Sequence, residues 1–176
     1  MQGNRMSVQT YFTVLPSPIG ELLVVGADDA SAHLAISGLF MTGQRYEPML
    51  RPEWLRDANR FADAEKQLDA YFGGDLTDFD LPLAARGSEF QRSVWTALCD
   101  IPLGATRAYG QIAEQVADKS KTRAVAAAIG RNPIGIVVPC HRVIGADGSL
   151  TGYAGGLDRK RWLLDHEARV SGTALL

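Results

Sequence analysis

The sequence contains only two cysteines, Cys99 and Cys140, among 176 residues. Two cysteines cannot build the disulfide framework of a small secreted scaffold, so we expect a reduced, cytoplasmic protein. No run of 18 or more apolar residues is present, which argues against a membrane span and a membrane partner. The polar residues 1–7 also lack the hydrophobic core of a signal peptide.

A large excess of either charge is also absent, because the net charge is only −2. This balance hides an asymmetry between the two halves. Residues 1–85 carry 6 basic and 12 acidic side chains, whereas residues 86–176 carry 12 basic and 8 acidic ones. A polyanionic partner is therefore expected to meet the second half, unless the asymmetry is ordinary scatter in surface charge.

The first half predicts a sheet followed by a helix. β-branched and aromatic residues, separated by turn residues, predict strands at 10–15, 21–25 and 32–36 in an antiparallel meander. Apolar residues then recur on one helical face until Gly73-Gly74, where the helix is expected to end. Alternating apolar residues at 79–83 predict a last strand.

The pattern changes near residue 85, and we expect a domain boundary there, with domains at 1–85 and 86–176. Ser88, with Gln91 three residues later, is typical of a capping box at the start of a helix. Short helices are predicted at 109–117 and 122–129 with a tight turn between them, which is the outline of a helix-turn-helix. A closing helix is predicted at 157–168.

The predicted helix at 122–129 has little side-chain bulk, because four of its residues are alanine. Arg123 is the one long side chain near its start. The helix could pack tightly in a core with Arg123 solvated, or lie flat in a nucleic-acid groove with Arg123 reaching in. The residues alone favour neither interpretation.

The stretch IVVPCHRVIG, residues 136–145, places Cys140 directly beside His141 after a proline. A thiol acts as a nucleophile in its thiolate form, which a nearby base can generate. Adjacent residues of an extended chain point to opposite sides, so this pair needs a bent backbone or an intervening water. A carboxylate would orient the histidine, and Glu167, Asp165 and Glu114 are all candidates.

A zinc site and a papain-like active site both fit the cysteines less well. The cysteines and histidines lack the paired spacing of zinc ligands. The local signature of papain-like thiol hydrolases is absent as well. Cys99, on an apolar helix face, is expected to be an ordinary core residue.

Pro139-Cys-His-Arg-Val143 resembles the active-site motif of the O6-alkylguanine-DNA alkyltransferases, also called methylated-DNA–protein-cysteine methyltransferases. Further matches together cover roughly residues 88–170: Tyr109-Gly-Gln-Ile-Ala, Arg123-Ala-Val, Asn132-Pro133, Gly152-Tyr-Ala-Gly-Gly156 and Trp162-Leu-Leu-Asp-His-Glu167. The first half resembles the family more loosely, through Ser17-Pro-Ile-Gly20 and Tyr71-Phe-Gly-Gly74. The implied fold is α/β (α+β), with a ribonuclease-H-like N-terminal domain and a mostly helical C-terminal domain that contains a helix-turn-helix.

The resemblance implies a role for each catalytic residue. Cys140 would accept the alkyl group from O6-alkylguanine, or from O4-alkylthymine, in DNA. His141 would take the thiol proton through a water molecule, and Glu167 would orient His141. Tyr109 would donate a hydrogen bond to guanine N3, and Asn132 would brace the turn that carries Cys140.

It also implies how DNA is held. The carbonyl groups of Cys140 and Val143 and a backbone N–H of Tyr153 or Ala154 would bind the base. The nucleotide must leave the duplex to react, and Arg123 would fill the space that it vacates. The other implied DNA-binding residues lie on the same helix: Thr122, Ala124 and Ala126. The alanines would let this helix press into the minor groove of double-stranded DNA, with self-association on DNA as a further expectation.

Two differences from the family qualify this picture. Some relatives bind zinc in the first domain, but residues 1–85 contain no cysteine, so we expect neither a metal nor a cofactor. Ala154 stands where relatives often have serine, which removes a hydroxyl contact.

The alternative function is a sensor or regulator that binds alkylated DNA without transfer. Related sensors have tryptophan at the position of Cys140, so the thiol favours repair.

Overall fold

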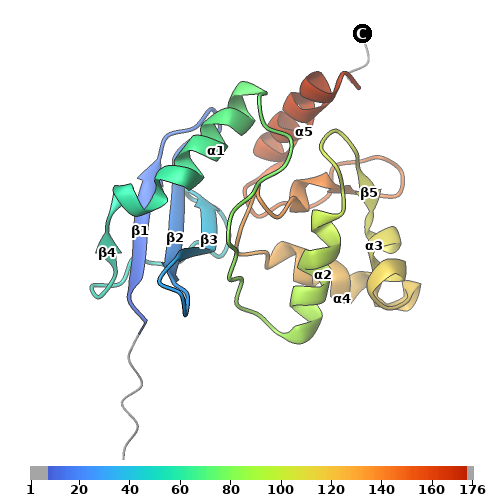
Figure 1. Cartoon of the computed structure of the whole chain (residues 1–176). Coiled ribbons are helices and arrows are strands. Elements are labelled where there is room, and N and C mark those ends of the chain that lie inside the picture. The colour runs from blue at the N-terminus through green and yellow to red at the C-terminus, as the bar shows by residue number, and fades with distance from the viewer. Residues whose placement is uncertain (1–7, 174–176) are drawn as a thin grey trace, which may run out of the picture.

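The computed structural model describes residues 8–173. Residues 1–7 and 174–176 lie outside the described residues, and so does the expectation that residues 1–7 contain no signal peptide. The first half folds into a four-stranded sheet with the order β3-β2-β1-β4 (Figure 1). Its strands are β1 (Thr10–Leu15), β2 (Leu22–Asp28), β3 (Leu34–Met41) and β4 (Leu55–Arg56). The first three form the predicted antiparallel meander, and β4, which the sequence did not predict, pairs in parallel with β1.

Helix α1 (Ala62–Gly73) follows a 3-10 turn at Ala58–Phe61 and lies across one face of this sheet (Figure 1). Its inner side chains Ala64, Leu68 and Tyr71 are buried, as the apolar pattern predicted. The helix ends as expected at the double glycine, because Gly74 adopts a left-handed φ of 84°.

The strand predicted at 79–83 is wrong. Only Leu83 forms a bridge, in parallel with Ile36, and the hydrogen bonds beside it join Ile36 to Pro82 and Ala84. Pro82 has no N–H to donate, so a longer ladder cannot continue through this segment. A second bridge, between Leu39 and Ile134, ties the same edge strand to the second half of the chain.

The second half is mostly helical, as predicted. Its helices are α2 (Glu89–Cys99), α3 (Tyr109–Val116), α4 (Thr122–Gly130) and α5 (Leu157–Ser171). Both hydrogen bonds of the predicted capping box at Ser88 and Gln91 are present. A 3-10 turn at Lys119–Lys121 joins α3 to α4 in the predicted helix-turn-helix outline. Two short strands, β5 (Arg107–Ala108) and β6 (Val143–Ile144), pair in parallel and were not predicted.

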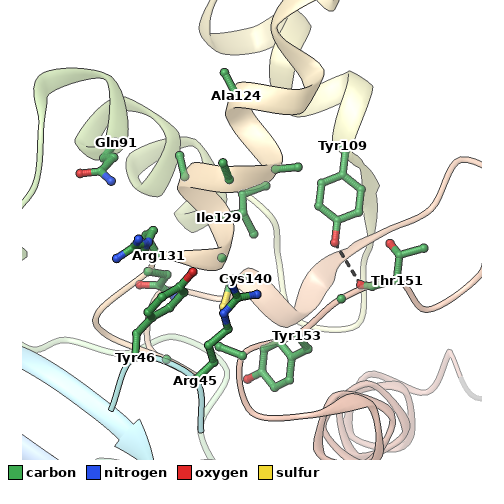
Figure 2. Close-up of a pocket in the computed structure, with 18 of the residues that line it drawn as sticks. Arg45, Tyr46, Gln91, Tyr109, Ala124, Ile129, Arg131, Cys140, Thr151 and Tyr153 are labelled. Atoms are coloured by element: carbon green, nitrogen blue, oxygen red, sulfur yellow. Dashed lines mark hydrogen bonds between the residues drawn. The ribbon is translucent and has the colours of Figure 1, made fainter. Parts of the chain in front are cut away.

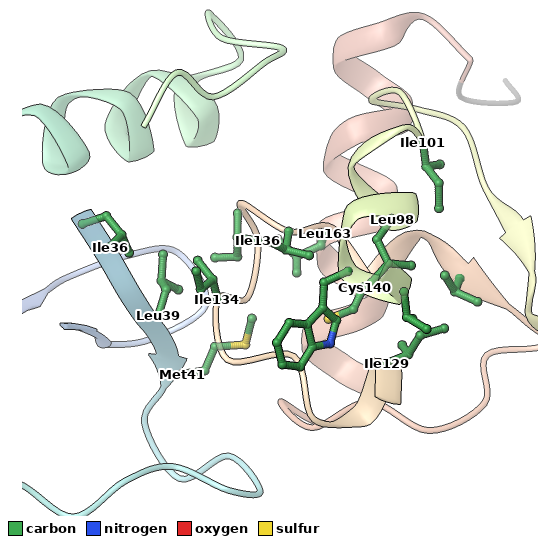
Figure 3. Close-up of a cluster of buried hydrophobic side chains, with 14 of the residues drawn as sticks. Ile36, Leu39, Met41, Leu98, Ile101, Ile129, Ile134, Ile136, Cys140 and Leu163 are labelled. Carbon is green, nitrogen blue, oxygen red and sulfur yellow. The ribbon is translucent and has the colours of Figure 1, made fainter. Parts of the chain in front are cut away.

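One continuous core joins the sheet to the helices. Leu39 and Met41 of β3 face the segment of Ile134 and Ile136, which in turn approaches Cys140 (Figure 3). Trp95 of α2 donates a hydrogen bond from Nε1 to the carbonyl of Ala128 at 2.9 Å, which fixes α2 against α4. The two halves therefore support the same cysteine.

The expectation that Cys99 is a core residue is wrong, because Cys99 is exposed. It is the last residue of α2, one position beyond the buried Leu98, and this step turns its side chain away from the core. Within residues 8–173, no helix is long and apolar enough to cross a membrane.

Candidate active site and DNA-binding groove

A groove of about 1380 Å³ opens beside Cys140 (Figure 2). Helix α4, the loop of residues 151–155 and the loop of residues 44–46 line it, together with the start of α2, Tyr109 and the turns that lead to Cys140. Most of the predicted site residues share this groove: Tyr109, Thr122, Arg123, Ala124, Ala126, Asn132, Cys140, Tyr153 and Ala154. The three others, His141, Val143 and Glu167, are fully buried and do not line it.

The segment that presents Cys140 is a series of turns. The apolar run before Pro139 looks strand-like in the sequence, but its backbone turns, and Ile136 has a φ of 68°. The side chain of Asn132 holds these turns together: Nδ2 donates to the Val138 carbonyl at 2.8 Å, and Oδ1 accepts from the Ile134 N–H at 3.0 Å. Asn132 therefore has the geometry to brace the cysteine.

Cys140 opens a 3-10 turn, Cys140–Arg142, and is only 8% exposed. Burial raises the pKa of its thiol, although the Asn132 side chain and the charge of Lys160 act in the opposite direction. The resting thiol therefore keeps its proton at neutral pH and needs a base in order to react.

His141, the residue expected to provide that base, is held by Glu167. Its Nε2 lies 2.7 Å from Oε1 of Glu167, and its Nδ1 is buried with no hydrogen-bond partner among the described residues. Burial lowers the pKa of His141, against the opposing effect of Glu167, so the ring is neutral at rest. If Nε2 carries the hydrogen and donates to Glu167, the lone pair of Nδ1 is free to accept a proton.

Of the three carboxylates that the sequence left open, Glu167 is the one that reaches His141. Arg142 donates to it twice, from Nε to Oε2 at 2.8 Å and from Nη2 to Oε1 at 2.9 Å, and the Tyr71 hydroxyl donates to Oε1 at 2.7 Å. Burial alone would raise the pKa of Glu167, but hydrogen bonds from His141 and Arg142 hold it well below its ordinary value. Asp165 is exposed. Glu114 is exposed too, and lies 3.9 Å from Lys119.

Sequence reasoning missed Tyr71 and Arg142 as partners of Glu167. Arg142 stands inside the motif, so its position next to His141 was a usable signal. Tyr71 was assigned to the core face of α1 and to the Tyr71-Phe-Gly-Gly74 match, neither of which indicated a partner, and its hydroxyl meets Glu167 across 96 positions of sequence. No local pattern could have indicated that contact.

Sequence reasoning also missed Lys160 of α5, whose side chain is completely buried. Its Nζ donates to the carbonyls of Val143 at 2.6 Å, Thr151 at 3.0 Å and Gly152 at 3.3 Å. Burial lowers the pKa of Lys160 to about 8, while the nearby Cys140 acts to raise it. Lys160 thus anchors the loop of residues 151–155. It also occupies one lone pair of the Val143 carbonyl, which is expected to bind the flipped base.

Tyr109 and Tyr153 flank the groove near Cys140 (Figure 2). The Tyr109 hydroxyl donates to the Thr151 carbonyl at 3.1 Å, so it must exchange this bond before it can donate to a base. Ala154 is held from the other half of the chain, because the Arg45 N–H donates to its carbonyl at 3.0 Å. The loop of residues 151–155 is therefore supported from both sides.

Helix α4 turns an open face toward the groove. Val125, Ala128 and Ile129 are buried, whereas Arg123, Ala124 and Ala127 are exposed. This exposure contradicts a helix packed tightly on all sides. It leaves a flat, small-residue surface with one arginine at its start.

Two segments match known protein families. Residues 89–169 match the DNA-binding domain of 6-O-methylguanine DNA methyltransferase, and residues 10–85 match its ribonuclease-like domain. A methylated-DNA–protein-cysteine methyltransferase of Mycolicibacterium paratuberculosis is 53% identical over 93% of this chain and 96% of its own length. The chain belongs to the 6-O-methylguanine DNA methyltransferase family.

Other members of the family extend this similarity. The methylated-DNA–protein-cysteine methyltransferase of Methanosarcina acetivorans is 46% identical over 89% of this chain and 97% of its own length. Mycobacterium tuberculosis OGT, solved in complex with DNA, superposes with a TM-score of 0.83 at 48% identity, covering 91% of this chain and 94% of that one. The family inferred from the PCHRV motif and the predicted α+β fold class are both confirmed.

Metal ligands do not gather anywhere in the described part of the chain. Within residues 8–173, no group of three or more histidine, cysteine, aspartate or glutamate side chains is placed to hold an ion.

Proposed function

We propose that the protein repairs double-stranded DNA by moving an alkyl group from O6 of guanine to Sγ of its own Cys140. The observation that carries this proposal is a nearly buried thiol at the groove beside a neutral histidine whose Nδ1 has no partner among the described residues. The names of the relatives fit it, since they are methylated-DNA–protein-cysteine methyltransferases.

The reaction balances with the groups in the site. Sγ of Cys140 attacks the alkyl carbon, the bond between that carbon and O6 breaks, and the electron pair leaves with guanine. The thiol proton passes through a water molecule to Nδ1 of His141, and Glu167 stabilises the imidazolium that results. Tyr109 donates a hydrogen bond to guanine N3, which stabilises the charge on the departing base.

The substrate must reach Cys140 outside the base stack. An O6-alkyl group lies inside the duplex, so we propose that the nucleotide flips into the groove, at a cost of a few kcal/mol. Thr122, Ala124 and Ala126 would let α4 lie against the minor groove, while Arg123 fills the vacated space. Tyr153, Ala154 and the Val143 carbonyl would contact the flipped base.

We propose the domain boundary at residues 85 and 86, because the two family matches end at residue 85 and begin at residue 89. Action in the cytoplasm also fits, since the nucleophile must stay a reduced thiol. Self-association on DNA stays a prediction, which the ratio of protein to duplex in analytical ultracentrifugation tests.

The decisive experiment uses a duplex with one O6-methylguanine and an excess of that duplex over protein. We expect mass spectrometry to find one methyl group, on the peptide that contains Cys140, and none on Cys140→Ser. The alternative function, a sensor without transfer, predicts tight binding while the lesion stays in the DNA. Multiple turnovers from substoichiometric protein would refute the stoichiometric mechanism.

A further inference from the structure

Two arginines from opposite halves of the chain meet on one tyrosine ring at the edge of the groove (Figure 2). Arg45 and Tyr46 lie in the loop after β3, and Arg131 follows the end of α4. The guanidinium carbon of Arg131 lies 3.9 Å from the centre of the Tyr46 ring, and that of Arg45 lies 4.8 Å from it. Both distances fit cation–π contacts.

Neither guanidinium group forms an ion pair with a carboxylate of residues 8–173. The adjacent acid in the sequence, Glu47, is engaged elsewhere, because its Oε2 accepts from the Gly43 N–H at 2.7 Å. Two positive charges held on one ring repel each other, and a shared anion would relieve this repulsion. The arrangement therefore favours a negatively charged partner.

Tyr46 has an unusual backbone for a bulky residue. Its φ is 66°, in the left-handed region that favours glycine, and its side chain is 44% exposed. An aromatic residue held in this conformation and open to solvent gains little from the core. Strained backbone conformations cluster at functional sites, so the conformation of Tyr46 at the rim of the groove indicates a functional role.

The position of the three residues indicates which anion they would meet. They line the same groove as Arg123 and Cys140. Arg123 lies near the start of α4 and Arg131 just beyond its end, a separation of roughly 12 Å along the helix axis. A DNA strand that lies along α4 would pass both arginines.

We propose that Arg45, Tyr46 and Arg131 form a phosphate-binding cluster, through which the N-terminal half contacts the backbone of the DNA. Guanidinium groups bind phosphodiester oxygens well, and the ring fixes both groups before the anion arrives. This inference rests on the proposed function, because it requires DNA in the groove. The charge distribution predicted that a polyanionic partner would contact residues 86–176. The proposed cluster adds a contact from the first half of the chain.

The test is the salt dependence of binding to an unmodified duplex, measured by fluorescence anisotropy. Each phosphate contact contributes a slope of about −0.9 to a plot of log affinity against log salt concentration. We expect Arg45→Gln and Arg131→Gln each to make the slope shallower by about that amount and to weaken binding several-fold at low salt. Arg45→Lys and Arg131→Lys keep the charge, so the slope should stay close to that of the wild type.

The matched control is Arg56→Gln, which removes the same charge from an exposed site on β4 that does not line the groove. This control should leave the slope unchanged. A slope that is the same in Arg45→Gln, Arg131→Gln and Arg56→Gln would overturn the phosphate-binding cluster.

Alkyl transfer from free O6-benzylguanine separates this inference from the proposed function. Without DNA, both glutamine variants should react at the wild-type rate. Losses of similar size on the free base and on DNA would mean that the cluster supports the active-site loop, which would also overturn the inference. A wild-type protein that transfers no alkyl group at all would instead refute the proposed function.

Discussion

Nε2 of His141 lies 2.7 Å from Oε1 of Glu167, and neither side chain is exposed to solvent. The same carboxylate accepts hydrogen bonds from Arg142 and Tyr71, so it is fixed from three sides. A carboxylate fixed in this way sets the orientation of the imidazole ring and favours the tautomer with hydrogen on Nε2. Among the described residues Nδ1 has no hydrogen-bond partner, so in the proposed mechanism it is the atom that accepts the proton of Cys140.

Glu167→Gln should impair both reaction and stability, because a neutral amide supports the imidazolium less well and leaves Arg142 without its counter-charge. We expect transfer at least about tenfold slower and a loss of roughly 3 kcal/mol in the free energy of unfolding. Transfer rates on methylated duplex and urea unfolding measure the two effects.

Tyr71→Phe is the matched control for Glu167→Gln, because it removes one hydrogen bond to the carboxylate and leaves the charge pair intact. It should cost about 1 kcal/mol of stability and leave the transfer rate near that of the wild type. Equal transfer rates for the wild type and Glu167→Gln, with both folded, would remove Glu167 from the proton relay.

Stability should fall as the pH is lowered from neutral. The pKa of buried His141 lies below its ordinary value of 6.5, so below that pH the unfolded chain binds a proton that the folded chain does not. The lowered pKa of Glu167 adds a second loss as the pH falls below its ordinary value of 4.5. Both contributions are fully present above about pH 6.5.

Urea unfolding between pH 8 and pH 4 checks this prediction, with Glu167→Gln measured alongside. The variant lacks the titrating carboxylate, so its stability should decline less below pH 4.5 than that of the wild type. A wild-type stability that stays constant over the whole range would show that neither group is held as the structure indicates.

Much of the fold could be predicted because the signals are local. The capping box at Ser88, the double glycine after α1 and the turn residues of the meander each act within a few residues. The strand at 79–83 failed because alternation alone ignores Pro82, and β4 was missed because Leu55–Arg56 is too short to show a pattern. Cys99 was misplaced because the last residue of a helix can turn out of an apolar face.

The site was predictable only as far as its motif reaches. The roles of the residues around Cys140 could be assigned by resemblance. The residues alone left three carboxylates as candidates to orient His141. Tyr71, Lys160, Arg45 and Tyr46 come together only in the folded chain, since long-range packing brings them to the groove. Lysines also rarely bury, so nothing local distinguishes Lys160 from its exposed neighbour Arg161.

Arg123→Ala should weaken repair in duplex DNA far more than transfer from free O6-benzylguanine. Arg123 is exposed at the groove and forms no ion pair within the described residues, so its loss should not disturb Cys140. In the proposed mechanism, Arg123 matters only where a base stack must be held open after the nucleotide flips. Rates on the two substrates measure the difference, and losses of equal size would refute a role in intercalation.

The alkylated protein should be less stable than the unmodified one. Cys140 is 8% exposed and belongs to the core cluster, so an added methyl group enters a region that is already packed. Overpacking of this kind costs about 1–3 kcal/mol, and each kcal/mol lowers the Tm of a chain of this size by roughly 2–4 °C.

Thermal unfolding before and after complete reaction with methylated duplex, followed by removal of the DNA, measures this loss of stability. The product is a thioether, which water and cellular thiols do not cleave, so the modified protein can be purified and compared directly. Cys140→Ser, treated in the same way, should show no shift. Cys99→Ala should shift like the wild type, because the exposed Cys99 lies outside the groove. A methylated protein that melts at or above the temperature of the unmodified protein would mean that the groove accommodates the alkyl group without strain.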